Sequence, residues 1–80
     1  MNHEEPLMAY CLIKVETGVE EDVYKSLEKI PGVKPYIVYG IFDIVAEIRA
    51  KDQDAVKEII EEKIRKIDGI YRTSTQFILP

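Results

Sequence analysis

Length, composition and charge exclude several classes of protein at the outset. Eighty residues suffice for one small domain, and 46% hydrophobic with 32% charged residues are globular proportions rather than those of disordered or collagen-like chains. A net charge of -4 argues against an autonomous nucleic-acid binder. No apolar run approaches the roughly 20 residues that span a bilayer, so we expect a cytoplasmic protein without membrane contact.

A single cysteine excludes an internal disulfide, and a core of this size gives little surplus stability. We therefore expect oligomerisation to support the fold. Isoleucine, valine, glutamate and lysine are abundant while asparagine and glutamine are scarce, a bias typical of thermophile proteins.

The first half of the chain predicts a strand, a helix and a second strand. Residues 1–7 read as a polar tail, and a single domain is expected over 8–80. Residues 8–15 are nearly continuously apolar, as in a central strand. Thr17 and Glu20 have the spacing of a capping box that starts a helix, which Pro31-Gly32 ends. Residues 33–39 contain Pro35 and so predict an edge strand.

The second half repeats this order. Residues 43–49 alternate in polarity and predict a strand with one face buried. Asp52 can cap a second helix with an apolar stripe that runs to Ile67, and Gly69 ends it. Residues 70–79 alternate again and predict the last strand.

This order of elements predicts an α+β, ferredoxin-like βαββαβ fold, with two helices on one face of a four-stranded antiparallel sheet. The first and third strands should be central. The opposite face is too apolar to leave in water, and we expect it to form a homodimer interface. The residues expected on that face are Tyr10, Leu12, Lys14, Val45, Glu47, Arg49, Tyr71, Thr73, Thr75 and Phe77; those assigned to the interface are Tyr10, Leu12, Val45, Glu47, Arg49, Tyr71 and Phe77.

The sequence offers little catalytic chemistry. His3 is the one histidine and lies in the polar tail, where a solvated side chain is more common than a ligand. Cys11 alternates with the other residues expected on the buried face of its strand, and a cysteine there more often packs as a small apolar side chain than acts as a reactive thiol. The spacing of cysteine and histidine fits no zinc site, and no glycine-rich phosphate loop precedes a helix. We therefore expect no catalytic residue, no metal and no cofactor.

The turn Gly40-Ile41-Phe42-Asp43 is the most informative segment for function. A glycine there can present backbone N–H groups to a carboxylate, and Asp43 can meet an ammonium, so the turn suits an amphoteric ligand. The alternative is a plain hairpin in which Gly40 supplies a positive φ and Asp43 caps the turn. Thr73 and Thr75 share one face of the last strand, where threonines are also simply good β-formers.

The stretch from Gly40 to Ile48, together with Ile67-Asp68-Gly69-Ile70 and residues 72–75, resembles the effector-binding domain of the Lrp/AsnC family, called the RAM (regulation of amino acid metabolism) domain. The resemblance covers about residues 8–79. It implies a ferredoxin-like fold, dimers that pair through their sheets, and rings that are commonly octameric.

The resemblance also implies an amino-acid effector, bound between dimers near the turn. Gly40, Ile41 and Phe42 would supply N–H groups and shape, Asp43 would hold the amino group, and Thr73 and Thr75 would complete the pocket. Family regulators carry a helix-turn-helix domain before this one, whereas about seven residues precede the first strand here. We therefore expect a stand-alone form that does not itself bind DNA, and full-length regulators are expected as further partners.

Two other functions stay open at this point. One is a pure assembly partner of such regulators that binds no ligand. The other is a small dimeric oxygenase or isomerase with a pocket between sheet and helices, for which Tyr10, Tyr36 and Tyr39 are the candidate groups.

Overall fold

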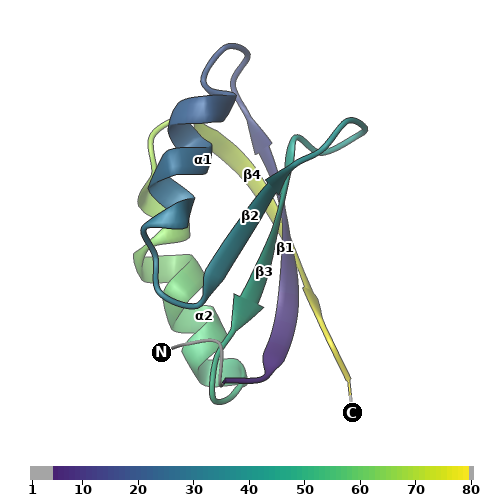
Figure 1. The fold of residues 1–80 in the computed structure, drawn as a ribbon, viewed down its shortest axis with the longest axis vertical. Coiled ribbons are helices and arrows are strands. Elements are labelled where there is room, and N and C mark those ends of the chain that lie inside the picture. Colours follow the sequence, from purple (N-terminus) through teal and green to yellow (C-terminus); the bar gives the residue numbers. More distant parts are fainter. Residues whose placement is uncertain (1–4, 80) are drawn as a thin grey trace.

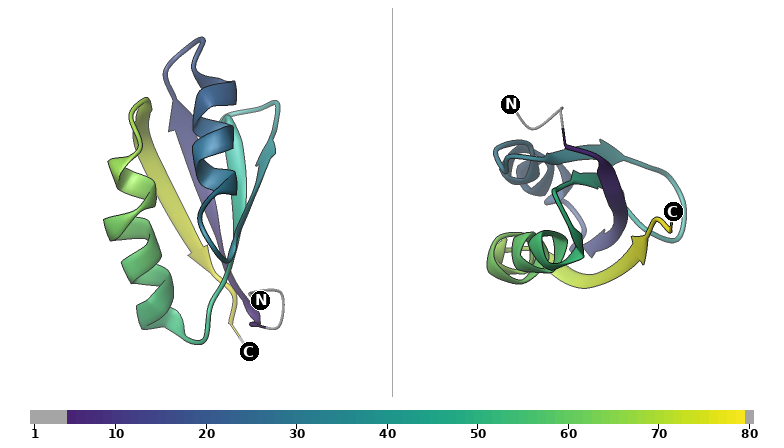
Figure 2. Two further views of the ribbon diagram at one scale, coloured as in Figure 1. Left: turned by 60° about the vertical axis from the view of Figure 1, so that its left-hand side comes forward. Right: turned by 90° about the horizontal axis from the view of Figure 1, so that it is seen from below.

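The computed structural model describes residues 5–79 and has the predicted ferredoxin-like architecture. Its elements are β1 (Leu7–Val15), α1 (Glu20–Glu28), β2 (Val33–Ile37), β3 (Ile44–Arg49), α2 (Gln53–Glu62), the 3-10 helix η2 (Ile64–Lys66) and β4 (Ile70–Phe77). The strands form one antiparallel sheet in the order β2-β3-β1-β4, and both helices cover the same face (Figures 1 and 2). Residues 1–4, which include His3 and most of the predicted tail, lie outside the described part.

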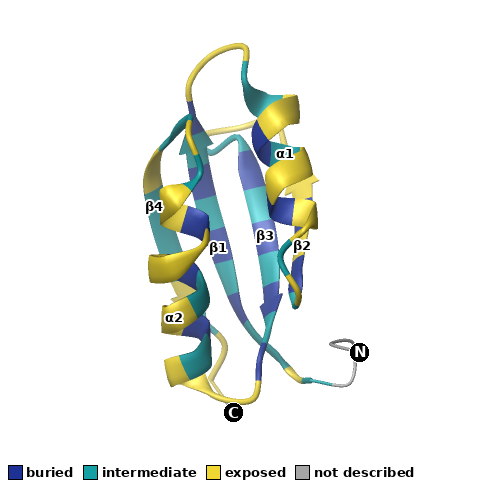
Figure 3. Ribbon diagram, turned by 90° about the vertical axis from the view of Figure 1, so that its left-hand side faces the viewer, coloured by how far each residue is buried: buried dark blue, intermediate teal, exposed yellow. Residues whose placement is uncertain are grey.

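The core lies between the sheet and the helices because the central strands alternate strictly in burial (Figure 3). Each helix contributes one apolar stripe, with Val23 and Leu27 buried from α1 and Val56 and Ile60 buried from α2. The buried apolar residues are Ala9, Cys11, Ile13, Val15, Val23, Leu27, Val33, Ile44, Ala46, Ile48, Ala50, Val56, Ile60 and Ile64.

The two helices begin differently. Asp52 caps α2 as predicted, because its carboxylate accepts the N–H of Ala55 at 2.8 Å. The predicted Thr17 cap is wrong: α1 has Val19 at its N-cap position without a side-chain cap. The Glu20 carboxylate nevertheless reaches back and accepts the N–H of Gly18 at 3.1 Å. Glu20 therefore reaches back to the turn before α1, but its partner is the N–H of Gly18 and not that of Thr17, so the predicted capping box is not formed.

The predicted face of β4 is also wrong. Thr73, Thr75 and Phe77 lie opposite Ile13, Cys11 and Ala9, all buried under the helices. Directly paired residues of antiparallel strands share a face, so this β4 row faces the helices rather than the open side. Tyr71 lies at an irregularity in the β1–β4 register and is exposed. Phe77 packs against the core. The open face receives Arg72, Ser74 and Gln76 instead, beside Lys14, Leu12 and Tyr10.

Candidate functional site

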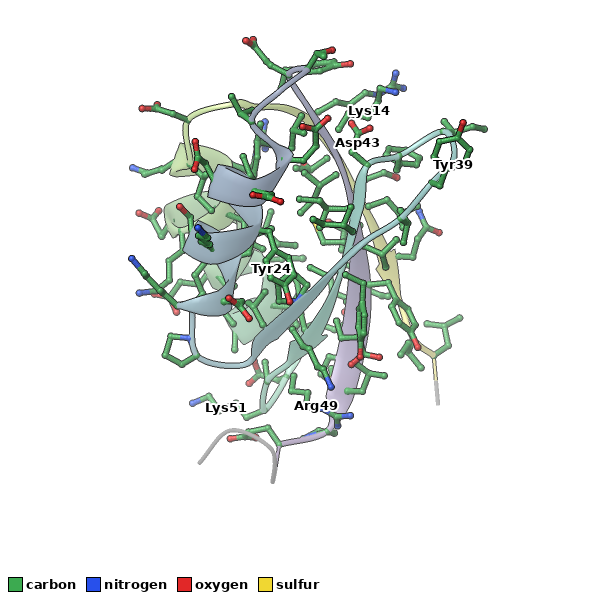
Figure 4. All side chains as sticks on the ribbon, turned by 45° about the horizontal axis from the view of Figure 1, so that its top comes forward. Lys14, Tyr24, Tyr39, Asp43, Arg49 and Lys51 are labelled. Carbon is green, nitrogen blue, oxygen red and sulfur yellow. The ribbon has the colours of Figure 1, made fainter. Side chains whose placement is uncertain are left out.

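The turn singled out by the sequence forms the tip of the β2–β3 hairpin. The N–H of Val38 donates to the carbonyl of Asp43 at 2.9 Å and closes the loop. Two large apolar side chains at this tip lie in water: Tyr39 is fully exposed (107%) and Ile41 is 81% exposed. Figure 4 shows Tyr39 at the end of the hairpin, beyond the sheet. Exposed apolar groups at one point are typical of a contact surface.

Asp43 ties this tip to the end of β1. Its N–H donates to the carbonyl of Ile13 at 2.9 Å, and its carboxylate accepts the N–H of Val15 at 2.9 Å. β3 begins at Ile44, so a side chain satisfies the last donor of β1 where a backbone carbonyl would otherwise be needed. Lys14 adds a bond from its Nζ to the carbonyl of Ile41 at 2.6 Å (Figure 4). The Asp43 carboxylate therefore has a structural role. It binds the backbone of β1 and does not cap its own turn.

Gly40 does not supply the positive φ of the plain-hairpin alternative. The described glycines with positive φ are Gly18, Gly32 and Gly69. A Cβ at Gly40 would meet nothing within 4 Å. Among residues 5–79, the N–H groups of Gly40, Ile41 and Phe42 take no part in the backbone hydrogen bonds of turns and loops. They remain as donors for another group.

A depression of about 500 Å³ lies beside the tip and is lined by Glu20, Glu21, Ile37, Val38, Tyr39, Gly40 and Asp43. Three acidic residues thus line one hollow and give it negative charge, which favours a cation such as an ammonium group. Glu20 and Glu21 were not among the site residues predicted from the sequence. Acids in the first turn of a helix are expected from the helix dipole alone, so no local signal distinguished them.

Thr73 and Thr75 do not join this depression. They line a separate groove of about 230 Å³ beside α2, with Lys57, Ile60, Glu61, Arg65 and Phe77. In the strand order, β4 forms one edge of the sheet, and β1 lies between it and β3. Within one chain the two halves of the predicted pocket therefore face different hollows.

Cys11 is buried in the core, as its position in β1 predicted. Burial raises the pKa of its thiol to about 11, although a hydrogen bond with the Thr75 side chain acts in the opposite direction. The thiolate, which is the nucleophile, is therefore scarce at neutral pH. This environment fits a small packing residue.

Of the three tyrosines of the enzyme alternative, Tyr36 lines an open hollow of about 480 Å³ beside α1 and β2, together with Tyr24 and Glu28 of α1. The buried space between the sheet and the helices is a different region. Buried apolar side chains occupy that space in the described chain. Tyr36 and Tyr39 are exposed, and Tyr10 lies on the open face. No cluster of three potential metal ligands occurs within residues 5–79. None of the helices described is long and apolar enough to cross a membrane.

Two curated proteins of different kinds are similar to this chain. It is 35% identical over 71 residues to an uncharacterised HTH-type transcriptional regulator of Pyrococcus furiosus, a match that covers 84% of this chain and 47% of the relative. It is also 35% identical over 77 residues to a homocitrate synthase of Sulfurisphaera tokodaii, covering 94% of this chain and 16% of the enzyme. The chain spans about half the length of the regulator.

Solved structures share the fold. A protein from Thermus thermophilus superposes with a TM-score of 0.88 at 25% identity, covering 94% of this chain and 95% of that one. A transcriptional regulator of Neisseria meningitidis in complex with L-Met has a TM-score of 0.83 at 18% identity, covering 98% and 53%. The family model for the Lrp/AsnC ligand binding domain matches residues 8–80. Together, this match and the fold show that the chain belongs to the Lrp/AsnC ligand-binding domain family.

Proposed function

We propose that this chain is an amino-acid-sensing effector-binding module that self-assembles and modulates transcriptional regulators of the Lrp/AsnC type. The observation that carries the proposal is the pairing of two kinds of group at the hairpin tip. The N–H groups of Gly40, Ile41 and Phe42 take no part in backbone hydrogen bonds, and Gly40 lines the same depression as the acidic residues Asp43, Glu20 and Glu21. A free amino acid carries a carboxylate, which can accept from the backbone N–H groups, and an ammonium group, which can bind the acidic side chains.

Asp43 is well suited to hold the ammonium because its position is fixed. Its Oδ2 is engaged by Val15, which orients the carboxylate without removing its charge. Glu20 and Glu21 add negative charge from α1 on the other side of the depression. A rigid, oriented acceptor costs little ordering entropy when the ligand binds.

A neighbouring subunit would complete the site in this proposal. Thr73 and Thr75 face a different hollow of the same chain, so they contribute to a pocket at the tip only if they come from another copy. The exposed apolar tip, with Tyr39 and Ile41, is the surface that such a neighbour would cover.

The open face of the sheet supports the dimer contact of the proposal. Tyr10, Leu12, Val45, Glu47 and Arg49 keep their predicted place on it, each only partly buried in the single chain. The relatives support the regulatory role. The Pyrococcus furiosus relative is an HTH-type transcriptional regulator, and the Neisseria meningitidis regulator was crystallised with L-Met.

The test is a thermal-shift screen of the purified chain against the twenty amino acids, in denaturant if the melting temperature is high. A ligand that binds the folded state raises Tm by mass action. We expect one or a few amino acids to do so. We expect Asp43→Asn to weaken their binding at least tenfold, because the amide keeps an acceptor for Val15 but loses the charge that attracts the ammonium.

Asp43→Ala is the matched control for structure. It removes both the charge and the acceptor for the Val15 N–H, so it should also lower unfolding free energy by about 1–3 kcal/mol, whereas the amide variant should not. Ligand binding by Asp43→Asn at wild-type affinity would refute the assigned role of Asp43. No shift with any amino acid would favour the ligand-free assembly partner.

A second candidate is a regulatory module for a biosynthetic enzyme rather than for a DNA-binding protein. The homocitrate synthase match favours it, because 94% of this chain aligns to only 16% of that enzyme. The same effector site would serve both roles. Mixing the purified chain with each kind of relative, and measuring mass by light scattering, distinguishes them by which one forms a mixed assembly.

A further inference from the structure

A hollow of opposite charge to the one at the hairpin tip lies at the start of β4. It has a volume of about 340 Å³ and is lined by Arg65, Ile70, Tyr71, Arg72 and Thr73. Two of these side chains are guanidinium groups, and none is acidic. In a chain with a net charge of -4, the hollow therefore gathers positive charge on one small surface.

The positive charge of Arg72 has no acidic partner within residues 5–79. Arg72 is exposed and lies directly opposite Lys14 in the β1–β4 register. Like charges in that position repel each other. The Lys14 ammonium donates to the carbonyl of Ile41, which carries no charge, and no ion pair between described residues includes Arg72. An anion bound at Arg72 would therefore reduce the repulsion.

Arg65 brings the second guanidinium group from η2. Its Nη1 donates to a carboxylate oxygen of Glu61 at 3.2 Å, and both side chains of this pair are exposed. A guanidinium group has five N–H donors, so most of them remain for another acceptor. Glu61 lines the neighbouring groove beside α2 and does not line this hollow. The ion pair therefore orients Arg65 and leaves donors for a ligand.

The backbone of β4 adds an uncharged donor at the same place. The bond from Ile78 N–H to Met8 C=O (2.8 Å) fixes the alternation between β1 and β4, so the N–H of Thr73 points away from β1. Tyr71 has no partner in the β1 register, which is irregular at this point. The extra residue of a bulge is left unpaired, and the side chains around it are re-aimed.

We propose that this hollow binds a phosphate monoester, whose oxygens are held by the guanidinium groups of Arg65 and Arg72. The planar fork of arginine matches the geometry of a phosphate group. A phosphate monoester carries a charge of about -1.5 to -2 at neutral pH, close to the two positive charges that line the hollow. The hydroxyl and N–H groups of Thr73 supply further donors, and phosphate oxygens accept from all of them.

The lining of the hollow distinguishes this ligand from the effector of the proposed function. An amino acid carries an ammonium group, for which this hollow has no carboxylate. The depression at the hairpin tip has Glu20, Glu21 and Asp43 for that purpose. The two hollows therefore select ligands of different charge, and the phosphate site does not depend on the proposed effector site.

Isothermal titration calorimetry at constant ionic strength tests the class of ligand, with three probes. AMP is a phosphate monoester, adenosine is the same molecule without the phosphate, and L-malate is a dianion without phosphorus. We expect saturable binding of AMP, no binding of adenosine, and binding of L-malate weaker by at least about tenfold, because its carboxylates are spread along a chain. No binding of AMP, or equal binding of adenosine or L-malate, would overturn the proposal.

Arg72→Gln tests the assigned side chain. We expect it to weaken AMP binding by at least about tenfold, the effect of losing a charge-assisted hydrogen bond. Arg72→Lys keeps the charge but loses the fork, so its loss should be intermediate. Lys51→Gln is the matched control: it makes the same charge change at an exposed residue beyond β3, at the other end of the sheet. Unimpaired binding by Arg72→Gln, or an equal loss for Lys51→Gln, would overturn the assignment.

Amide chemical shifts from NMR locate the ligand without any substitution. Titration with AMP should move the signals of Tyr71, Arg72 and Thr73 and leave that of Gly40 in place. The reverse pattern would place the phosphate at the hairpin tip and overturn the proposal. An amino-acid screen without any hit would count against the effector site alone, because it does not involve this hollow.

Discussion

Leu27→Ala should destabilise the fold by about 2–5 kcal/mol, the range for removing a fully buried leucine side chain. Leu27 is fully buried, and with Val23 it supplies the buried stripe by which α1 covers the sheet. The alanine leaves a cavity that the close-packed core fills only in part. Chemical denaturation followed by circular dichroism measures the loss.

Leu79→Ala is the matched control, because the same side chain is removed where it is 76% exposed. We expect its effect on the unfolding free energy to stay within about 0.5 kcal/mol. Equal losses for the two variants would contradict the placement of Leu27 in the core.

Gly32→Ala should be the second severe substitution, with a loss of about 2–4 kcal/mol. Gly32 has φ of +85°, which costs an alanine roughly 1–2 kcal/mol. A Cβ there would also lie 2.5 Å from the carbonyl oxygen of Arg49, so the backbone at the end of the β2–β3 ladder must move. That displacement adds strain of about the size seen in overpacked cores. A thermal melt should show Tm lowered by roughly 10 °C or more.

Gly40→Ala provides the contrast for Gly32→Ala. Gly40 has no positive φ and has open space where a Cβ would go, so its replacement should leave Tm nearly unchanged. A large loss at Gly40, or none at Gly32, would contradict the backbone geometry described for these two turns.

Much of the fold follows from signals within a few residues. Strict alternation in residues 43–49 fixes the buried face of β3, and Asp52 lies three residues before the N–H that it caps. Pro35 predicts an edge strand because it lacks a donor, and β2 is an edge strand. The predicted strand extends to Tyr39, but β2 ends at Ile37, where the exposed hairpin tip begins.

The face of β4 depended on its neighbour. Both rows of that strand mix apolar and polar residues, so its own pattern does not select a side; the register with β1 does, because a shift of one residue reverses every side chain. The second helical segment illustrates the same limit. Its apolar stripe runs to Ile67, yet α2 ends at Glu62 and a separate 3-10 turn follows.

The sequence by itself determined the family and the order of elements, because motifs, caps and periodicity are local properties. The tertiary structure decided which groups share a hollow. It brought Glu20 and Glu21 to Asp43, separated Thr73 and Thr75 from it by the width of β1, and gave the Asp43 carboxylate the N–H of Val15. These relations join residues far apart in the chain, and they are fixed by strand order and register.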